Sequence, residues 1–186
     1  MIFLSKRGDM IFEILVLLVT LILLLYLQSK NKNSWKVFLI TAIGVLLFEY
    51  FTQALWFNQN LENWAYLYLD ISWVLTLLWT NVILFSIFTI ENLNPRVSEI
   101  KKFFMSIGII TIFVVVIEWI LIRTNIRGYP QVILDLYESL PRLFGIVPLK
   151  ELIYVIAFMS LVVAFTRYWQ ENYNLKFNDL KGGKRK

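Results

Sequence analysis

Five long apolar stretches constrain the fold of this chain more than any other feature of its sequence. A helix that crosses a lipid bilayer needs about 20 mostly apolar residues. Five segments meet this requirement: residues 10–28, 35–57, 64–90, 103–122 and 149–169. Since 59% of the 186 residues are hydrophobic, more than a soluble domain of this size can bury, the sequence predicts an all-α, polytopic membrane protein with five transmembrane helices. Ordinary soluble enzymes, disordered chains and secreted disulfide scaffolds are excluded.

The segment before the fifth stretch, residues 131–147, differs from it in composition. It is shorter than a membrane span, carries Asp135 and Arg142, and is interrupted by Pro141. We therefore expect a short interfacial helix in the last outer loop rather than a sixth span.

The absence of histidine and cysteine limits the chemistry that this protein can perform. Disulfides, histidine- or thiolate-bound zinc, thiol nucleophiles and serine–histidine–aspartate triads are excluded. Any catalysis would depend on carboxylates, tyrosines, lysines or a bound small molecule. We expect no cofactor and no metal ion.

Lysine and arginine are distributed unevenly between the two sides of the predicted membrane domain. With the N-terminus outside, twelve basic residues fall on the inner side and six on the outer side, as the positive-inside rule requires. We therefore expect an integral protein of the cell membrane, with the N-terminus outside and the C-terminus in the cytoplasm. Residues 1–170 would form a single helical transmembrane domain, and residues 171–186 a basic cytoplasmic tail. The net charge of +5 then reflects topology and contact with anionic lipid, and we expect no nucleic-acid partner.

Several carboxylates fall within or at the edge of the predicted spans, where ionisable groups are expensive and mark function. In the predicted topology they all lie in the outer half of the bilayer: Glu13, Glu49, Asp70, Glu118 and Glu151. Glu13 and Glu151 are near enough to the headgroups to be ordinary interfacial charges. The candidate catalytic residues are Glu118, Glu49, Asp70 and Glu151.

Helical periodicity places aromatic and polar side chains beside these acids. The candidate substrate-binding residues are Gln53, Trp56, Tyr66, Trp73, Tyr129 and Tyr154. Together they predict an acid-floored cavity with aromatic walls that takes a lipophilic small molecule. Two plainer interpretations stay open: the aromatic rings could form an interfacial belt, and the buried glutamates could serve as polar packing groups between helices.

A weak internal repeat is also present. Glu49 and Glu118 each stand near the end of a predicted span and precede a loop that contains aromatic residues, Trp64 and Tyr66 in one case and Tyr129 in the other. This pattern indicates that the second and third spans and the fourth and fifth spans form parallel repeats.

The second half of the chain resembles a known family. Glu118, the run Arg-Thr-Asn-Ile-Arg-Gly-Tyr-Pro at 123–130, and the run Gly-Ile-Val-Pro-Leu-Lys-Glu-Leu-Ile-Tyr at 145–154 are similar to the integral-membrane carotenoid enzymes. These are the membrane lycopene cyclases and the related carotenoid hydratases. The cyclases carry a Pro-Leu-Glu-Glu motif that leads into an aromatic-rich helix, and here Lys150 stands where the first glutamate of that motif would be.

The resemblance implies acid-catalysed cyclisation, hydration or isomerisation of an isoprenoid without redox chemistry, the work of a lyase or isomerase. Glu118 or Glu49 would protonate a double bond, and Trp73, Tyr129 and Tyr154 would stabilise the carbocation. Two other classes fit the same residues. One is a non-enzymatic binder or transporter, and the other is an accessory subunit bound to a membrane protein partner.

Overall fold

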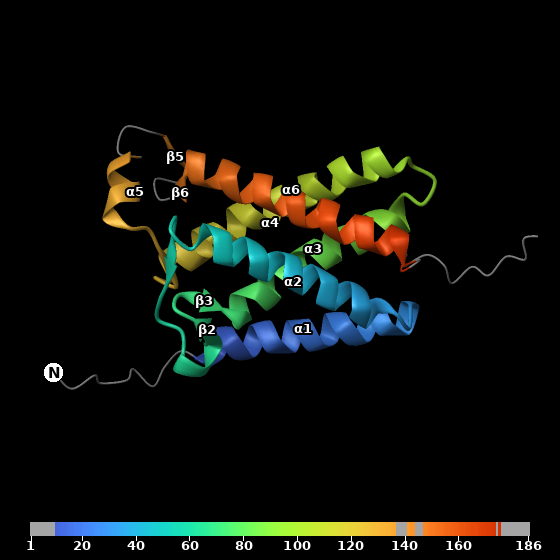
Figure 1. The fold of residues 1–186 in the computed structure, drawn as a ribbon, viewed down its shortest axis with the longest axis horizontal. Helices are drawn as coiled ribbons and strands as arrows, with labels where there is room; N and C mark the ends of the chain where they lie inside the picture. The colour runs from blue at the N-terminus through green and yellow to red at the C-terminus, as the bar shows by residue number, and fades with distance from the viewer. Residues whose placement is uncertain (1–9, 137–140, 144–146, 174, 176–186) are drawn as a thin grey trace, which may run out of the picture.

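The chain is a bundle of long helices. The computed structural model describes residues 10–136, 141–143, 147–173 and 175, without the side chains of Val147 and Glu151. Five long helices run side by side along the molecule (Figure 1), namely α1 (Met10–Lys30), α2 (Ser34–Thr52), α3 (Trp73–Leu93), α4 (Glu99–Arg123) and α6 (Leu149–Asn172). Each contains an apolar segment long enough to cross a membrane, which confirms the predicted five-span helical fold.

The second and third helices are shorter than the sequence predicted. Helix α2 ends at Thr52 rather than at residue 57, and α3 begins at Trp73 rather than at residue 64. Ser72 caps α3, its hydroxyl accepting a hydrogen bond from the Leu75 amide. The chain between these helices contains β1 (Phe57–Asn58), the 3-10 turn η1 (Asn63–Ala65), β2 (Tyr66–Tyr68) and β3 (Ile71–Ser72). Tryptophan, tyrosine and leucine are as apolar in this loop as in a helix, so hydropathy alone extended the predicted span.

The last loop is also built differently from the prediction. The interfacial helix α5 (Gln131–Leu136) is present but short, and β4 (Arg127–Gly128) precedes it. Strands β5 (Arg142–Leu143) and β6 (Val147–Pro148) then form an antiparallel hairpin. Residues 137–140, like most of the predicted tail, lie outside the described residues.

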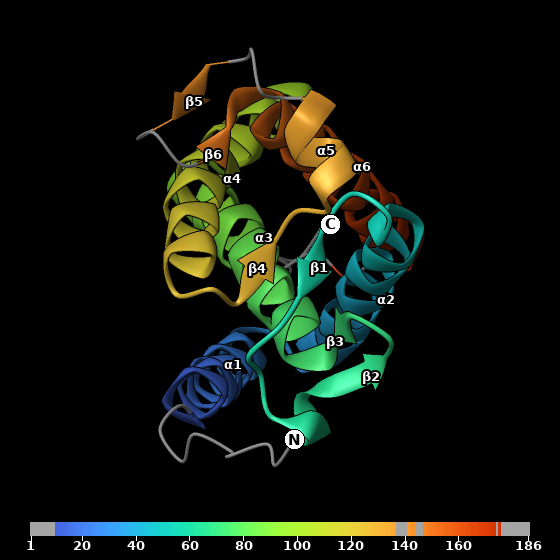
Figure 2. The same ribbon diagram turned by 90° about the vertical axis from the view of Figure 1, so that its left-hand side faces the viewer.

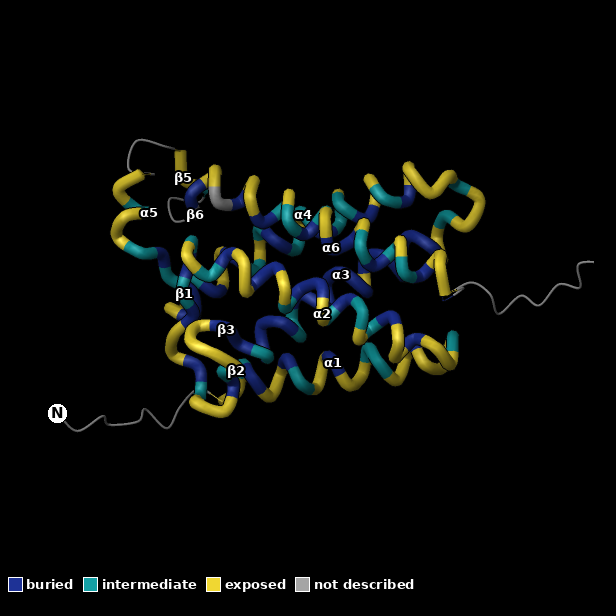
Figure 3. The backbone as a smooth tube through the Cα atoms, in the orientation of Figure 1, coloured by how far each residue is buried: buried dark blue, intermediate teal, exposed yellow. Residues whose placement is uncertain are grey.

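Helix α3 occupies the centre of the bundle and is the most buried of the five (Figure 3). Helices α2, α6, α4 and α3 pack in a ring in which each contacts its two neighbours, and α1 packs outside the ring against α3 and α2 (Figure 2). The buried apolar core follows the inner faces of these helices.

The ring is made of two equivalent halves. Each half consists of a helix, a short strand, a hairpin and a second helix. The first half contains α2, β1, the β2–β3 hairpin and α3. The second half contains α4, β4, the β5–β6 hairpin and α6, with α5 inserted between β4 and β5. The first helices of the two halves bury the same positions, since Thr41, Val45 and Glu49 correspond to Ile110, Val114 and Glu118.

The hairpins and the strands support the same correspondence. The first hairpin pairs Tyr66 with Ser72, and the second pairs Arg142 with Pro148; in each case the helix begins at the next residue. Strands β1 and β4 pair antiparallel, with Asn58 opposite Arg127. Each of these two residues lies nine positions after the glutamate of its half. Asn58 and Arg127 hold the same position in the two halves and face one another across the antiparallel pair. An approximate two-fold axis that relates the two halves therefore passes between these two residues. The repeat indicated by the sequence is therefore a structural one.

Candidate functional site

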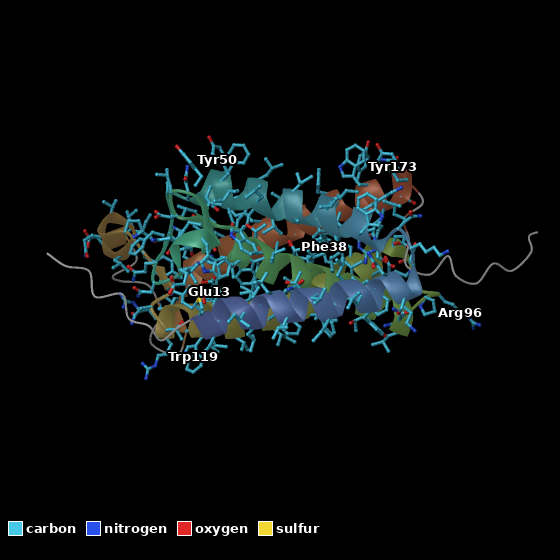
Figure 4. The ribbon with its side chains drawn as sticks, turned by 90° about the horizontal axis from the view of Figure 1, so that it is seen from below. Glu13, Phe38, Tyr50, Arg96, Trp119 and Tyr173 are labelled. Carbon is cyan, nitrogen blue, oxygen red and sulfur yellow. The ribbon has the colours of Figure 1, made fainter. Side chains whose placement is uncertain are left out.

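Three of the four buried acids among the described residues lie at one end of the bundle, and the fourth, Glu91, lies at the other end in the last turn of α3. Glu13 in the first turn of α1, Glu49 near the end of α2 and Glu118 near the end of α4 all lie toward the loops that contain β1 and β4. Figure 4 labels Glu13 at this end and Arg96 at the opposite one. The site described below is centred on β1 and β4, where the two halves meet.

Glu118 forms a buried ion pair with Arg127. The Nη1 atom of Arg127 donates a hydrogen bond of 2.5 Å to Oε1 of Glu118, and both side chains are only 1% exposed. The Nε atom of Arg127 also donates to Oδ1 of Asn58 across the strand pair, at 3.3 Å. A turn with a left-handed residue, Asn125 (φ 56°), reverses the chain after α4 and brings Arg127 back to the helix end.

Two tryptophans stack against the Arg127 guanidinium. Its central carbon lies 5.0 Å from the centre of the Trp56 ring and 6.0 Å from that of Trp79. These distances permit cation–π attraction, which is stronger when the cation is removed from water. Trp56, one of the predicted substrate-binding residues, has Arg127 as a neighbour.

Arg127 and Trp79 are the two important residues that the sequence reasoning missed. Arg127 was grouped with the basic residues of the outer loop, and Trp79 shares no helical stripe with an acid. A buried charge needs a partner. The short distance in sequence between Arg127 and the intramembrane Glu118 was therefore a signal from which their ion pair could have been predicted.

Glu49, the counterpart of Glu118 in the first half, has different surroundings. It is 2% exposed, and its Oε2 accepts a hydrogen bond of 2.7 Å from the Thr76 hydroxyl. Its Oε1 has no hydrogen-bond partner among the described residues. Arg127 interacts electrostatically with Glu49 but forms its hydrogen bond with Glu118. Two equivalent glutamates therefore lie near one arginine, and Glu49 is the one that forms no ion pair with any described residue.

A narrow crevice lies beside Glu49. It has about 180 Å³ of empty space, too confined for a water-sized sphere, and is lined by Glu49, Gln53, Trp56, Asn58, Asp70 and Ile71. Four of the predicted site residues, Glu49, Gln53, Trp56 and Asp70, thus meet at one place. Where the sequence predicts an acid-floored cavity with aromatic walls, the described part of the chain has this narrow crevice.

Asp70 does not lie inside a helix as predicted. It is in the exposed turn between β2 and β3, and its backbone oxygen accepts a hydrogen bond of 2.7 Å from Nδ2 of Asn58. The preceding residue, Leu69, has a left-handed backbone (φ 48°), which ends β2 and prevents a continuous helix here. The crevice is therefore lined by a loop residue, Asp70, rather than by an intramembrane acid on α3.

The predicted aromatic residues take several positions. Tyr66 lies in β2, and burial is the main cause that raises the pKa of its hydroxyl. Trp73 packs against Trp64, whose backbone oxygen accepts a 2.6 Å hydrogen bond from the Trp73 indole. These residues join the first hairpin to α3 and do not line the crevice.

The remaining predicted residues belong to the second half. Tyr129 is buried directly after β4, and Tyr154 is exposed on α6. Glu151 lies in the first turn of α6, and its side chain falls outside the described residues.

Glu13 makes a separate contact at the same end of the bundle. It is 0% exposed, and its Oε1 accepts a hydrogen bond of 3.0 Å from the Glu62 amide, which connects α1 to the first loop. It does not line the crevice. Glu13 is therefore a buried acid against which the role of Glu49 can be compared.

Within the described ranges, no cluster of three or more acidic side chains is placed to hold a metal ion. Comparison with family models, with curated proteins and with solved structures finds no match to this chain.

Proposed function

We propose that this chain is an integral membrane enzyme that transfers a proton to a carbon–carbon double bond of an apolar isoprenoid, with Glu49 as the acid. The observation that carries the proposal is the inequality of two equivalent glutamates. Arg127 compensates the charge of Glu118 through an ion pair, whereas Glu49 lines the crevice and forms no ion pair with a described residue. Each of the two carboxyl groups also has one buried oxygen without a hydrogen-bond partner among the described residues, so the ion pair is the difference between them. Two carboxyl groups in such different environments are suited to different roles in acid–base chemistry.

The reaction requires no oxidant. Protonation by Glu49 forms a new C–H bond at one carbon of the double bond and leaves a positive charge at the other. A second double bond can attack this cation to close a ring, water can add to it, or a neighbouring carbon can lose a proton to give an isomer. Loss of a proton completes each path, and Glu49 is the group placed to take it back.

The resemblance of the second half to membrane carotenoid enzymes supports an isoprenoid as substrate. Its matching residues Pro148, Leu149 and Glu151 stand at the start of α6. Glu49 lies near the end of α2, which packs against α6, and both positions belong to the end of the bundle that holds the acids. Because the crevice does not hold a water-sized sphere in this structure, it has to widen to admit one end of the polyene.

Expression in a bacterial host that accumulates an acyclic polyene tests the proposal. The pigments are extracted and resolved by chromatography and mass spectrometry. We expect a product of the same mass as the polyene, or one heavier by a molecule of water, and we expect Glu49→Gln to abolish it. Glutamine keeps the shape and can still accept the hydrogen bond from Thr76, but it has no acidic proton.

Glu13→Gln is the matched control, since it removes the proton of another buried acid at the same end of the bundle. This variant should keep its activity. An unchanged pigment profile with the wild-type protein would overturn the proposal, and so would equal loss of product in both variants.

We also propose that the acidic end faces the outside of the cell membrane. The opposite end carries several exposed basic residues, among them Lys32, Lys36, Arg96 and Lys101, and such residues favour the cytoplasmic side. The chain has no cysteine, so a single Asn60→Cys variant can be labelled in intact cells with a membrane-impermeant maleimide. Labelling of Lys32→Cys in place of Asn60→Cys would reverse the assignment.

A further inference from the structure

A second, larger hollow lies between α1 and α3, nearer the end of the bundle opposite the acids. This groove has a volume of about 470 Å³, within the usual range for small-molecule sites. Its walls include Val19, Ile22 and Tyr26 from α1 and Phe85, Phe88 and Asn92 from α3. Val19, Ile22 and Phe85 are also exposed on the outer surface of the bundle. The groove is therefore open to the hydrocarbon of a surrounding bilayer.

The groove changes in character along its length. Its walls are apolar through Ile22 and Phe85 and become polar at Asn92, near the end of α3. The rings of Tyr26 and Phe88 pack edge to face, with 5.4 Å between the ring centres. One turn beyond, the Lys30 ammonium lies 5.6 Å from the centre of the Tyr26 ring. An apolar channel that ends beside an amide and a cation matches an amphipathic ligand with a negative head.

The groove exists because α1 stands outside the internal repeat. Helix α3 is covered by α1, whereas no described long helix covers the corresponding outer face of α6. Near the middle of both helices, Asn81 of α3 donates a hydrogen bond of 2.7 Å to Thr20 of α1, at the edge of the groove. From Ile22 to Tyr26 the α1 side chains are partly or largely exposed, and within this stretch Tyr26 contacts α3 through Phe88.

The charge at this end identifies the head group. Lys30, Lys32 and Lys36 lie within or beside the short connection between α1 and α2. Two acids lie at the same end of the bundle but do not line the groove: Glu99 pairs with Lys102 and Arg167, and Glu91 is buried. Basic residues at the membrane surface attract anionic lipids.

We propose that this groove is a binding site for an anionic phospholipid, with one acyl chain between α1 and α3 and the phosphate at the Lys30 end. The site is separate from the acid cluster and does not depend on the proposed catalytic function.

Native mass spectrometry of the purified protein tests the site. The full chain in a mild detergent is mixed with equal amounts of phosphatidylglycerol and phosphatidylcholine of identical acyl chains. We expect a several-fold preference for phosphatidylglycerol in the first bound lipid. Lys30→Gln should reduce this preference about fivefold, the effect of one basic residue on an anionic lipid surface. Lys101→Gln, which removes an exposed lysine at the same end of the bundle but on α4, should leave it unchanged.

A second pair of variants tests the groove itself. Val19→Trp places a large ring into the groove from a residue that is 45% exposed, and it should lower retention of the first phosphatidylglycerol by at least fivefold. Val116→Trp makes the same substitution on α4, at a residue that is 49% exposed and outside the groove, and should have no effect. If Val19→Trp does not fold, Ile22→Trp replaces it. Equal binding of both lipids by the wild-type protein, or equal retention by the two tryptophan variants, would overturn the proposal.

Discussion

Replacing Arg127 by methionine tests whether the ion pair holds the two halves of the bundle together. The substitution leaves Glu118 buried without its partner, removes the hydrogen bond to Asn58 and ends the stacking on Trp56 and Trp79. Loss of one member of a buried ion pair costs about 3–5 kcal/mol, and loss of a desolvated cation–π contact costs about 2 kcal/mol more. Methionine recovers part of this by packing between the rings. We expect a net loss of about 4 kcal/mol in the free energy of unfolding.

A competing argument predicts a much smaller effect. Polar contacts between membrane helices contribute on average about 0.6 kcal/mol, because helices that are unfolded but still in the membrane find other partners. Arg127 is only nine residues from Glu118, so their ion pair could persist after the bundle separates. It would then contribute little to stability, and the size of the loss distinguishes the two arguments.

The measurement is unfolding in mixed micelles with rising sodium dodecyl sulfate, followed by tryptophan fluorescence and circular dichroism. Four proteins are compared: the wild type, Arg127→Met, Glu118→Gln and the double variant. If the ion pair stabilises the fold, the two single variants together lose more unfolding free energy than the double variant does. We expect this difference to be at least about 2 kcal/mol, as for groups in direct contact. A loss below about 1 kcal/mol for Arg127→Met, or strict additivity, would refute the reasoning.

Three further predictions concern stability. A Cβ atom at Gly128 would lie 2.5 Å from the Phe57 ring, so Gly128→Ala should destabilise the protein by about 1–3 kcal/mol; Phe57→Leu should rescue it in the same unfolding assay. At Gly108 a Cβ atom would meet nothing within 4 Å, and Gly108→Ala in α4 should stabilise by up to about 1 kcal/mol; a loss there would show that the site is covered. Asn81→Leu removes the hydrogen bond to Thr20 and should lower the free energy of unfolding by about 0.6–1.7 kcal/mol. Adding Thr20→Val to the Asn81→Leu variant should lower it almost no further.

The number of long helices follows from the apolar stretches of the sequence, because a bilayer accepts backbone only as hydrogen-bonded segments of sufficient apolar length. The residues at which these helices begin and end were predicted less accurately. The predicted third span began at residue 64, whereas α3 begins at Trp73. The preceding hairpin is rich in tyrosine and leucine, so its hydropathy hides the turn at Leu69 and the cap at Ser72.

The candidate site was predicted in part. Glu49, Gln53 and Trp56 were placed together from helical spacing, and they line the same crevice in the structure. Asp70 reaches that crevice from a loop, which periodicity could not show. Arg127 was assigned to the outer loop because nothing local in the sequence indicates that β4 turns back to pair with β1.

The sequence by itself determined the helical membrane fold, the concentration of acids toward one end of the spans and the outline of an internal repeat. These depend on residue type and on regular spacing, which act within one helix. Only the tertiary structure decided which of the two equivalent glutamates is paired. That choice depends on Arg127 in one half standing opposite Asn58 in the other. The ion pair joins residues only nine positions apart, but it needs the chain to reverse after α4 and β4 to pair with β1, which no local pattern in the sequence shows.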